Sequence, residues 1–208
     1  MEKKTWKDSL MYEDEGDTWP MIIFKFFFPI CLWLGVFCVS YLIWGDLAIR
    51  WGAISLAYLF PPLGKESIIP LGVADGFHPM VMALTVFMVD TVMAMIISWN
   101  YYILEKIPLI GRIFKYAKSK GAETLDKHPS IKTGAFLGIF AIVSFPFIGA
   151  GGTTSGIVGR MIGLKPYYVI SAVAFGSLFS GIMYAYAAEW LIQVFAENVA
   201  LGIALIIA

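Results

Sequence analysis

Charged residues are scarce in this chain, and so are the residue types on which many enzyme sites depend. Only 14% of the 208 residues are charged, the net charge is zero, and there are two cysteines and two histidines. Cys31 and Cys38 share one apolar run, where we expect packing rather than a disulfide. Neither His78 nor His128 has neighbours that would complete a metal site or a catalytic triad. We therefore predict a non-enzyme with no metal, no cofactor and no nucleic-acid partner.

Apolar sequence takes the place of these groups. Hydrophobic residues make up 59% of the chain, aromatic residues 16%, and the mean hydropathy is +0.77, which is far from the average soluble domain. Because about 20 apolar residues cross the hydrocarbon core, this length suits one bundle of a few spans. The sequence predicts an all-α, multi-pass protein of the cell membrane, with lipids as neighbours and with a homo-oligomer as an open possibility.

Polar and broken stretches divide the chain. Residues 1–20 form a polar tail, and the long apolar run that follows is not that of a cleavable signal peptide. Residues 21–208 are predicted to form a single transmembrane domain. Its predicted parts after the first span are a first repeat over 47–104, a basic loop over 105–132, a second repeat over 133–190 and a final span over 190–208.

The loop at 105–132 predicts the orientation in the membrane. It carries seven Lys or Arg residues against three acidic residues. By the positive-inside rule, this loop and the N-terminus face the cytoplasm. The segment at 47–76 then enters the membrane from outside, and the corresponding segment of the second half enters from the cytoplasm.

Proline and glycine break two apolar segments in a similar pattern. The first break reads Phe60-Pro61-Pro62-Leu63-Gly64, with Pro70 further on, and the second reads Phe145-Pro146-Phe147-Ile148-Gly149. Such backbone is tolerated in lipid only where protein or a water-filled cavity surrounds it. We predict a helical bundle with two re-entrant helical hairpins, related by an offset of 85 residues. Because they enter from opposite sides, they form an inverted-topology repeat, which is typical of transporters.

Four charged residues at membrane depth form the predicted substrate and ion pathway, namely Glu66, Asp75, Asp90 and Arg160. Inserting a charged residue at the centre of a membrane helix costs about 2.5 to 3.5 kcal/mol, so a functional or structural role is expected for each. Asp90 lies midway along an uninterrupted span and is able to load and release a proton; a hydrogen bond between helices, or an ion pair with Arg160 or Arg50, is the alternative. Glu66 and Arg160 are expected to face each other, either as a pair that a substrate separates or as a fixed structural pair. The offset of 85 makes Asp75 and Arg160 equivalent.

A glycine-rich turn after the second break is a predicted anion site. Its residues are Gly149, Gly151, Gly152, Thr153, Thr154 and Ser155. Backbone N–H groups, hydroxyls and a helix N-terminus suit an anion such as phosphate, although the spacing of a nucleotide P-loop is absent. Close packing of glycine against a neighbouring helix explains the same residues.

Three motifs resemble one family. They are Glu66 followed by Ile69-Pro70-Leu71-Gly72-Val73-Ala74, then Glu105-Lys106-Ile107-Pro108-Leu109-Ile110, and Phe145-Pro146-Phe147-Ile148-Gly149-Ala150-Gly151. Over residues 61–190 the chain is similar to the small multidrug export family, itself distantly similar to DedA-type membrane proteins with re-entrant loops. This resemblance implies a small integral membrane transporter. DedA-type relatives are associated with moving polyprenyl-phosphate lipid carriers.

Three functions stay open at this point. The first is proton- or ion-coupled export of a small molecule through a site between the two hairpins. The second is a translocase, or flippase, for a polyprenyl-phosphate or another anionic lipid. The third is a non-transporting membrane scaffold that recruits soluble partners through its polar tail and basic loop.

Overall fold

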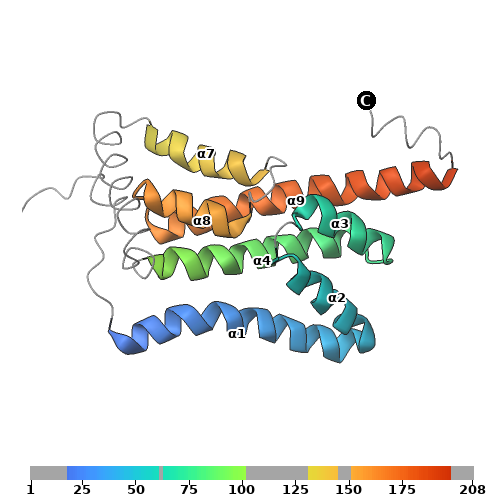
Figure 1. Ribbon diagram of the computed structural model, residues 1–208, viewed down its shortest axis with the longest axis horizontal. Helices are drawn as coiled ribbons and strands as arrows, with labels where there is room; N and C mark the ends of the chain where they lie inside the picture. The colour runs from blue at the N-terminus through green and yellow to red at the C-terminus, as the bar shows by residue number, and fades with distance from the viewer. Residues whose placement is uncertain (1–17, 61–62, 102–130, 145–150, 198–208) are drawn as a thin grey trace, which may run out of the picture.

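Helices make up almost all of the described chain, which comprises residues 18–60, 63–101, 131–144 and 151–197 of the computed structural model (Figure 1). The described helices are α1 (Trp19–Trp44), α2 (Asp46–Ala57), α3 (Lys65–Ala74), α4 (Pro79–Trp99), α7 (Ile131–Ser144), α8 (Gly152–Met161) and α9 (Pro166–Glu197). The predicted all-α class is confirmed for these residues.

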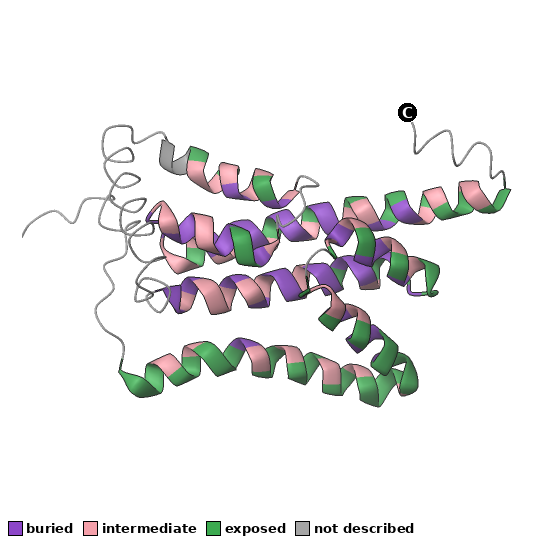
Figure 2. Cartoon of the chain, in the orientation of Figure 1, coloured by how far each residue is buried: buried purple, intermediate pink, exposed green. Residues whose placement is uncertain are grey.

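Three helices, α1, α4 and α9, are long and apolar enough to cross a membrane. Helices α4 and α9 pack against each other in opposite directions along the middle of the bundle. Helix α1 lies at the periphery and keeps most of its surface exposed (Figure 2). Large apolar side chains such as Phe24, Phe27 and Leu42 are on that exposed surface, which suits contact with lipid. The arrangement is that of a multi-pass membrane protein.

Proline and glycine set the boundaries of the helices. Pro79 and Pro166 begin α4 and α9, where a missing N–H costs no intrahelical hydrogen bond. Gly76 and Gly163 follow α3 and α8 with φ angles of +93° and +84°, a left-handed backbone that favours glycine. Pro70, by contrast, lies inside α3. Its prediction as a break is wrong, because in this short helix it removes only the hydrogen bond to the carbonyl of residue 66.

Helices α3 and α8 are built alike. Each has ten residues and begins after an extended glycine, Gly64 or Gly151. Their C-terminal turns repeat three backbone hydrogen bonds, in which Asp75, Gly76 and Phe77 donate to Leu71, Val73 and Gly72, and Ile162, Gly163 and Leu164 donate to Val158, Arg160 and Gly159. Every residue of the first set precedes its counterpart by 87 positions. Pro79 and Pro166, which begin the next helices, have the same spacing.

The predicted offset of 85 is therefore wrong for the helices. Gly64 follows Pro61 by three positions, whereas Gly151 follows Pro146 by five, so the second break is two residues longer. The predicted offset was taken from the break motif alone, which does not include the two additional residues before Gly151. The prolines Pro61, Pro62 and Pro146 themselves, and Gly149, lie outside the described residues.

With an offset of 87, the predicted equivalence of Asp75 and Arg160 is also wrong. Arg160 corresponds to Val73, and Asp75 corresponds to Ile162. The two charged residues thus occupy different positions in their helices: Asp75 follows the end of α3, and Arg160 lies in the last turn of α8.

The packing around the short helices is repeated as well. A Cβ on Gly72 would collide with the side chain of Met82, and a Cβ on Gly159 would lie 2.6 Å from a methyl carbon of Val169. Met82 and Val169 are again 87 positions apart. Each short helix also packs on the long helix of the other half, α3 on α9 and α8 on α4. The two halves are therefore interlocked rather than merely adjacent.

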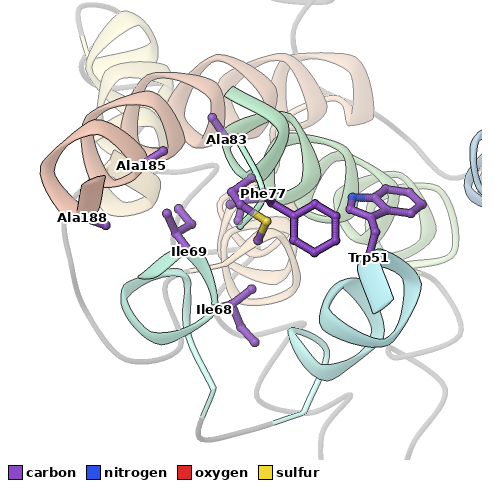
Figure 3. Packing of buried hydrophobic residues seen from close by; sticks show 9 residues of the cluster. Trp51, Ile68, Ile69, Phe77, Ala83, Ala185 and Ala188 are labelled. Carbon is purple, nitrogen blue, oxygen red and sulfur yellow. The ribbon is translucent and has the colours of Figure 1, made fainter. Parts of the chain in front are cut away.

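Two hydrophobic clusters form the core of the part of the chain that the structure describes. The first joins α2, α3, α4 and α9 through Trp51, Ile68, Ile69, Phe77, Met82, Ala83, Val86, Ala185 and Ala188 (Figure 3). The second joins α4, α7, α9 and the turn after α8 through Ala94, Ile139, Val143, Leu164, Val169, Ala172 and Val173. The first cluster thus anchors α2 and α3 to both long helices, and the second anchors α7 and the turn after α8 to both long helices.

One predicted boundary near the C-terminus differs from the structure. Helix α9 does not end at Trp190 but continues to Glu197. The stretch 182–197 contains no glycine or proline, so nothing in the backbone interrupts the helix there. Residues 198–208 lie outside the described residues.

Candidate functional site

The first residues of α3 and α8 lie near the middle of the two long helices. Lys65, which begins α3, bonds Ser180 in the middle of α9, and Gly152, which begins α8, bonds Asp90 in the middle of α4. From there the short helices run toward opposite ends of the bundle (Figure 1). We call the region formed by these four residues the central site.

Asp90 is held by one hydroxyl and one backbone amide. Its side chain is buried, and Oδ1 accepts hydrogen bonds from the hydroxyl of Tyr58 at 3.0 Å and from the N–H of Gly152 at 2.8 Å. Tyr58 follows the end of α2, so the contact joins α2, α4 and α8. The carboxylate also lies at the N-terminus of α8, where the helix dipole favours a negative charge.

Glycine makes this contact possible. A Cβ at Gly152 would lie 2.7 Å from the Cα of Asp90, and a Cβ at Gly151 would lie 3.1 Å from the Asp90 carboxylate. One turn later, a Cβ on Gly156 would lie 3.2 Å from the side chain of Ile97. Close packing therefore accounts for the glycines that begin α8.

The second carboxylate oxygen of Asp90, Oδ2, is buried and accepts no hydrogen bond within the described chain. A charged carboxylate with one oxygen unpaired in an apolar region is costly, and protonation removes that cost. Neither alternative ion pair of Asp90 is formed: Arg50 pairs with Asp75, and the guanidinium of Arg160 donates to the carbonyl of Leu164. The interaction of Asp90 between helices is a hydrogen bond.

Lys65 is the charged partner on the other side of the central site. It is 2% exposed, and its ammonium donates to the carbonyl of Val143 and to the hydroxyl of Ser180 at 3.0 Å. The ammonium lies 6.0 Å from the ring centroid of Tyr184. Val143 is in the last turn of α7, where carbonyls lack intrahelical partners. A cation at this end also matches the helix dipole.

Opposite charges thus stand at the two helix ends that flank the second break. The ammonium of Lys65 lies at the C-terminus of α7, and the carboxylate of Asp90 lies at the N-terminus of α8. Both side chains come from the first half of the chain. Each sign is the one that the corresponding helix end stabilises.

Glu66 lies next to Lys65 and is only partly buried. Its carboxylate folds back toward Gly64, where an added Cβ would meet it. Within the described chain it forms no ion pair with Arg160, so the predicted facing of these two residues is wrong. Arg160 lies in the last turn of α8, at the end of that helix away from the central site.

The structure divides the four predicted pathway residues. Glu66 and Asp90 lie in or beside the central site. Asp75 pairs with Arg50 at 3.2 Å on the exposed surface, and Arg160 lies buried 5.3 Å from the ring centroid of Tyr101. Since ten helical residues span about 15 Å, these two are a short helix away from the centre, at opposite ends.

The predicted anion turn is partly described. Gly149 lies outside the described residues, Thr153 and Thr154 are exposed, and Ser155 is buried. Gly151 and Gly152 face Asp90, so a carboxylate of the chain itself already stands at this helix N-terminus. An external anion would have to displace this carboxylate, or bind when the carboxylate is protonated.

Sequence reasoning missed Tyr58, Val143, Ser180 and Tyr184, and it did not include Lys65 in the pathway. A signal existed for Lys65, which is a charged residue directly after a break, and for Tyr58, which is a polar aromatic residue directly before it. Val143 contributes its backbone carbonyl, and Ser180 is one of several serines in an apolar helix. Nothing in the sequence distinguishes these two.

Comparison with known proteins identifies a family. A family model described as "Putative small multi-drug export protein" matches residues 66–183, more than half of the chain. The matched range includes Asp90, Gly152 and Ser180 and begins one residue after Lys65. No curated protein and no solved structure gives a significant match. The match over residues 66–183 shows that the chain belongs to this small multi-drug export protein family.

Proposed function

We propose that the protein is a proton-coupled exporter of a small molecule and that the central site binds both the proton and the substrate. The observation that carries this proposal is the setting of Asp90. One oxygen binds the first N–H of α8, while the other is buried without a partner in the described chain. A proton on the second oxygen neutralises the carboxylate without breaking the first contact.

The proposal includes the inverted repeat. Support comes from the spacing of 87 residues, which relates helix ends, glycines and backbone hydrogen bonds of α3 to those of α8. It also comes from the opposite directions of the two short helices (Figure 1). The pairs α2–α3 and α7–α8 then form re-entrant hairpins of repeats 47–104 and 133–190, within a single domain over 21–208.

Orientation follows from the basic loop. The start of α1, the end of α4 and the start of α7 lie at one end of the bundle (Figure 1). We assign this end to the cytoplasm, because the seven basic residues of 105–132 connect α4 to α7. The α2–α3 hairpin then enters from outside, and the α7–α8 hairpin enters from the cytoplasm.

Proton loading is coupled to movement through the N-terminus of α8. An ionised Asp90 attracts the positive end of the helix and accepts a charge-assisted hydrogen bond from Gly152. A protonated Asp90 keeps the hydrogen bond but loses the charge, so its hold on α8 weakens. Helices α4 and α8 are then free to shift relative to each other, and the proton leaves on the side to which the site next opens.

The two other candidate functions have less support. A lipid headgroup that is only anionic, such as polyprenyl phosphate, would meet the carboxylate of Asp90 at the same helix N-terminus and would bring no cation to balance it. A scaffold has no need for a buried ammonium and a buried carboxylate in the centre of its bundle, which are expensive at membrane depth. Export uses the carboxylate as the group that carries the proton.

Flux in proteoliposomes tests the proposal. With an imposed pH gradient and a panel of fluorescent drugs, Asp90→Asn is expected to lower pH-driven flux at least tenfold. Asp75→Asn, at the exposed end of α3, is the matched control and is expected to keep its flux. Circular dichroism of both variants checks the fold.

Wild-type flux in Asp90→Asn would exclude the proton role. A parallel assay with a fluorescent anionic lipid covers the flippase alternative. Lipid translocation that Asp90→Asn abolishes, without drug flux in the wild type, would replace export by lipid translocation.

A further inference from the structure

We propose that the central site takes a ligand that carries an ammonium group and an anionic group, and that Lys65 and Asp90 occupy its two subsites in the present structure. The inference rests on the proposed function, because it names the substrate class of the same site.

The ammonium subsite is built by the second half of the chain. The carbonyl of Val143, the hydroxyl of Ser180 and the ring of Tyr184 surround the ammonium of Lys65. A free helix C-terminus, a hydroxyl and an aromatic face are all suited to a cation. Lys65 belongs to α3 of the first half, whereas the groups that bind its ammonium belong to α7 and α9.

The anion subsite is the N-terminus of α8 with the hydroxyl of Tyr58. Both donate to the same oxygen of Asp90. A helix N-terminus binds carboxylate and phosphate groups through its N–H groups and its dipole. The second oxygen of Asp90, which is buried and unpartnered in the described residues, shows that the carboxylate is incompletely satisfied there.

Neither charge is bound by the other. Within the described chain Lys65 and Asp90 form no ion pair, although the field of Asp90 reaches the ammonium. Each is held by neutral dipoles instead. If the two side chains pair directly, the α7 end and the α8 end are released together.

Charge balance selects the ligand. A ligand with one charge of each sign fills both released subsites and leaves the net charge of the buried region unchanged. A ligand with a single charge would leave one helix end without a partner and add an unbalanced charge at membrane depth. The shared chemistry of ammonium and carboxylate or phosphate fits a soluble ω-amino acid and a phosphoethanolamine headgroup alike.

The test removes both internal groups. In the purified double variant Lys65→Ala/Asp90→Ala, we expect β-alanine or γ-aminobutyrate to raise the thermal unfolding midpoint. Ethylammonium and propionate added together at the same concentration are expected to raise it less. Labelled β-alanine is expected to bind the double variant at least tenfold more tightly than the wild type, because the internal groups no longer compete. The control Arg50→Ala/Asp75→Ala removes the exposed ion pair and should gain no binding.

The lipid source has its own arm. Nanodiscs of phosphatidylethanolamine are compared with nanodiscs of phosphatidylglycerol, which lacks the ammonium group. Stabilisation of the double variant by phosphatidylethanolamine alone supports the same chemistry with a lipid as its source. Because no arm measures flux, the result is independent of whether Asp90→Asn stops export.

Several outcomes would overturn the inference. They are no stabilisation by any of these probes, equal stabilisation by the mixture of ethylammonium and propionate, and equal affinity of wild type and double variant. If the double variant does not fold, the single variants decide. Ethylammonium must then stabilise only Lys65→Ala, and propionate only Asp90→Ala; failure of both rejects the subsites.

Discussion

The start of α3 and the start of α8 have equivalent positions but opposite chemistry. At α3 the short helix supplies an ammonium, and the long helix α9 supplies the hydroxyl of Ser180. At α8 the short helix supplies a backbone N–H, and the long helix α4 supplies the carboxylate of Asp90. At a spacing of 87, Lys65 corresponds to Gly152 and Asp90 to Ser177. The frame is repeated, whereas both charged side chains come from the first half.

This difference places one charge of each sign in a frame whose two parts are otherwise alike. Two identical charges at the centre would repel each other, and two neutral contacts would give a proton nothing to bind. One ammonium and one carboxylate, each placed at a helix end of matching sign, avoid both problems. Substitutions at one helix start at a time separate the contributions of the two charges.

The largest effect is expected at Gly152, where the two starts differ most in size. Gly152→Ala places a Cβ against the main chain of Asp90, which cannot move without distorting α4. We expect a loss of about 3 kcal/mol in the free energy of unfolding, as for an overpacked core. Reversible unfolding in SDS micelles measures it. Gly138→Ala in α7, whose Cβ would meet nothing within 4 Å, is the control and should be neutral or stabilising.

The next effect concerns the ammonium at the start of α3. Lys65→Met removes the donor to Val143 and Ser180 while keeping an unbranched side chain of similar length. We expect a loss of about 2 kcal/mol, because a buried carbonyl and a buried hydroxyl lose a charged partner. Ser180→Ala removes one acceptor only and should cost about 1 kcal/mol. A larger loss in Ser180→Ala than in Lys65→Met would contradict the role of the ammonium.

The effect of Tyr58→Phe on stability is expected to depend on pH. It removes one of the two donors to Asp90 and leaves the N–H of Gly152 in place. A hydrogen bond to a charged carboxylate is worth about 2 kcal/mol and one to a neutral acid about 1 kcal/mol. The loss in stability should therefore grow from low to high pH, as Asp90 loses its proton. A loss that is constant from about pH 5 to about pH 9 would mean that Asp90 does not titrate in this range.

The starts of α3, α4 and α9 could be predicted because they depend on local chemistry. Pro79 and Pro166 are the first residues of α4 and α9, and Gly64 directly precedes α3. The offset could have been read from the prolines, because Pro79 and Pro166 are 87 positions apart, whereas the break motif alone gives 85. Pro70 shows the reverse case, in which packing of Ile68 and Ile69 holds a helix that local chemistry opposes.

The contacts of the central site were less predictable than the fold. Sequence reasoning recognised Asp90 as a charge at membrane depth that is able to load and release a proton, with a hydrogen bond between helices or an ion pair as the alternative. One partner of its carboxylate is a backbone amide. Because every residue except proline has one, the sequence does not indicate which amide binds Asp90. The position of Arg160 was predicted wrongly. Its charge is visible in the sequence, but its distance from the central site depends on the residue at which α8 begins.

The smallest effect is expected at the far end of α3, where the first half carries a charged pair that the second half lacks. Asp75→Asn breaks the ion pair with Arg50, which is more than a third exposed on both sides. Solvent screens such a pair, so we expect a loss of about 0.5 kcal/mol, and less at high salt. Unfolding in SDS micelles at low and at high salt measures this difference. A loss as large as that of Lys65→Met would show that the end of α3, and not its start, fixes the helix, and the comparison of the two starts would then lose its place in the mechanism.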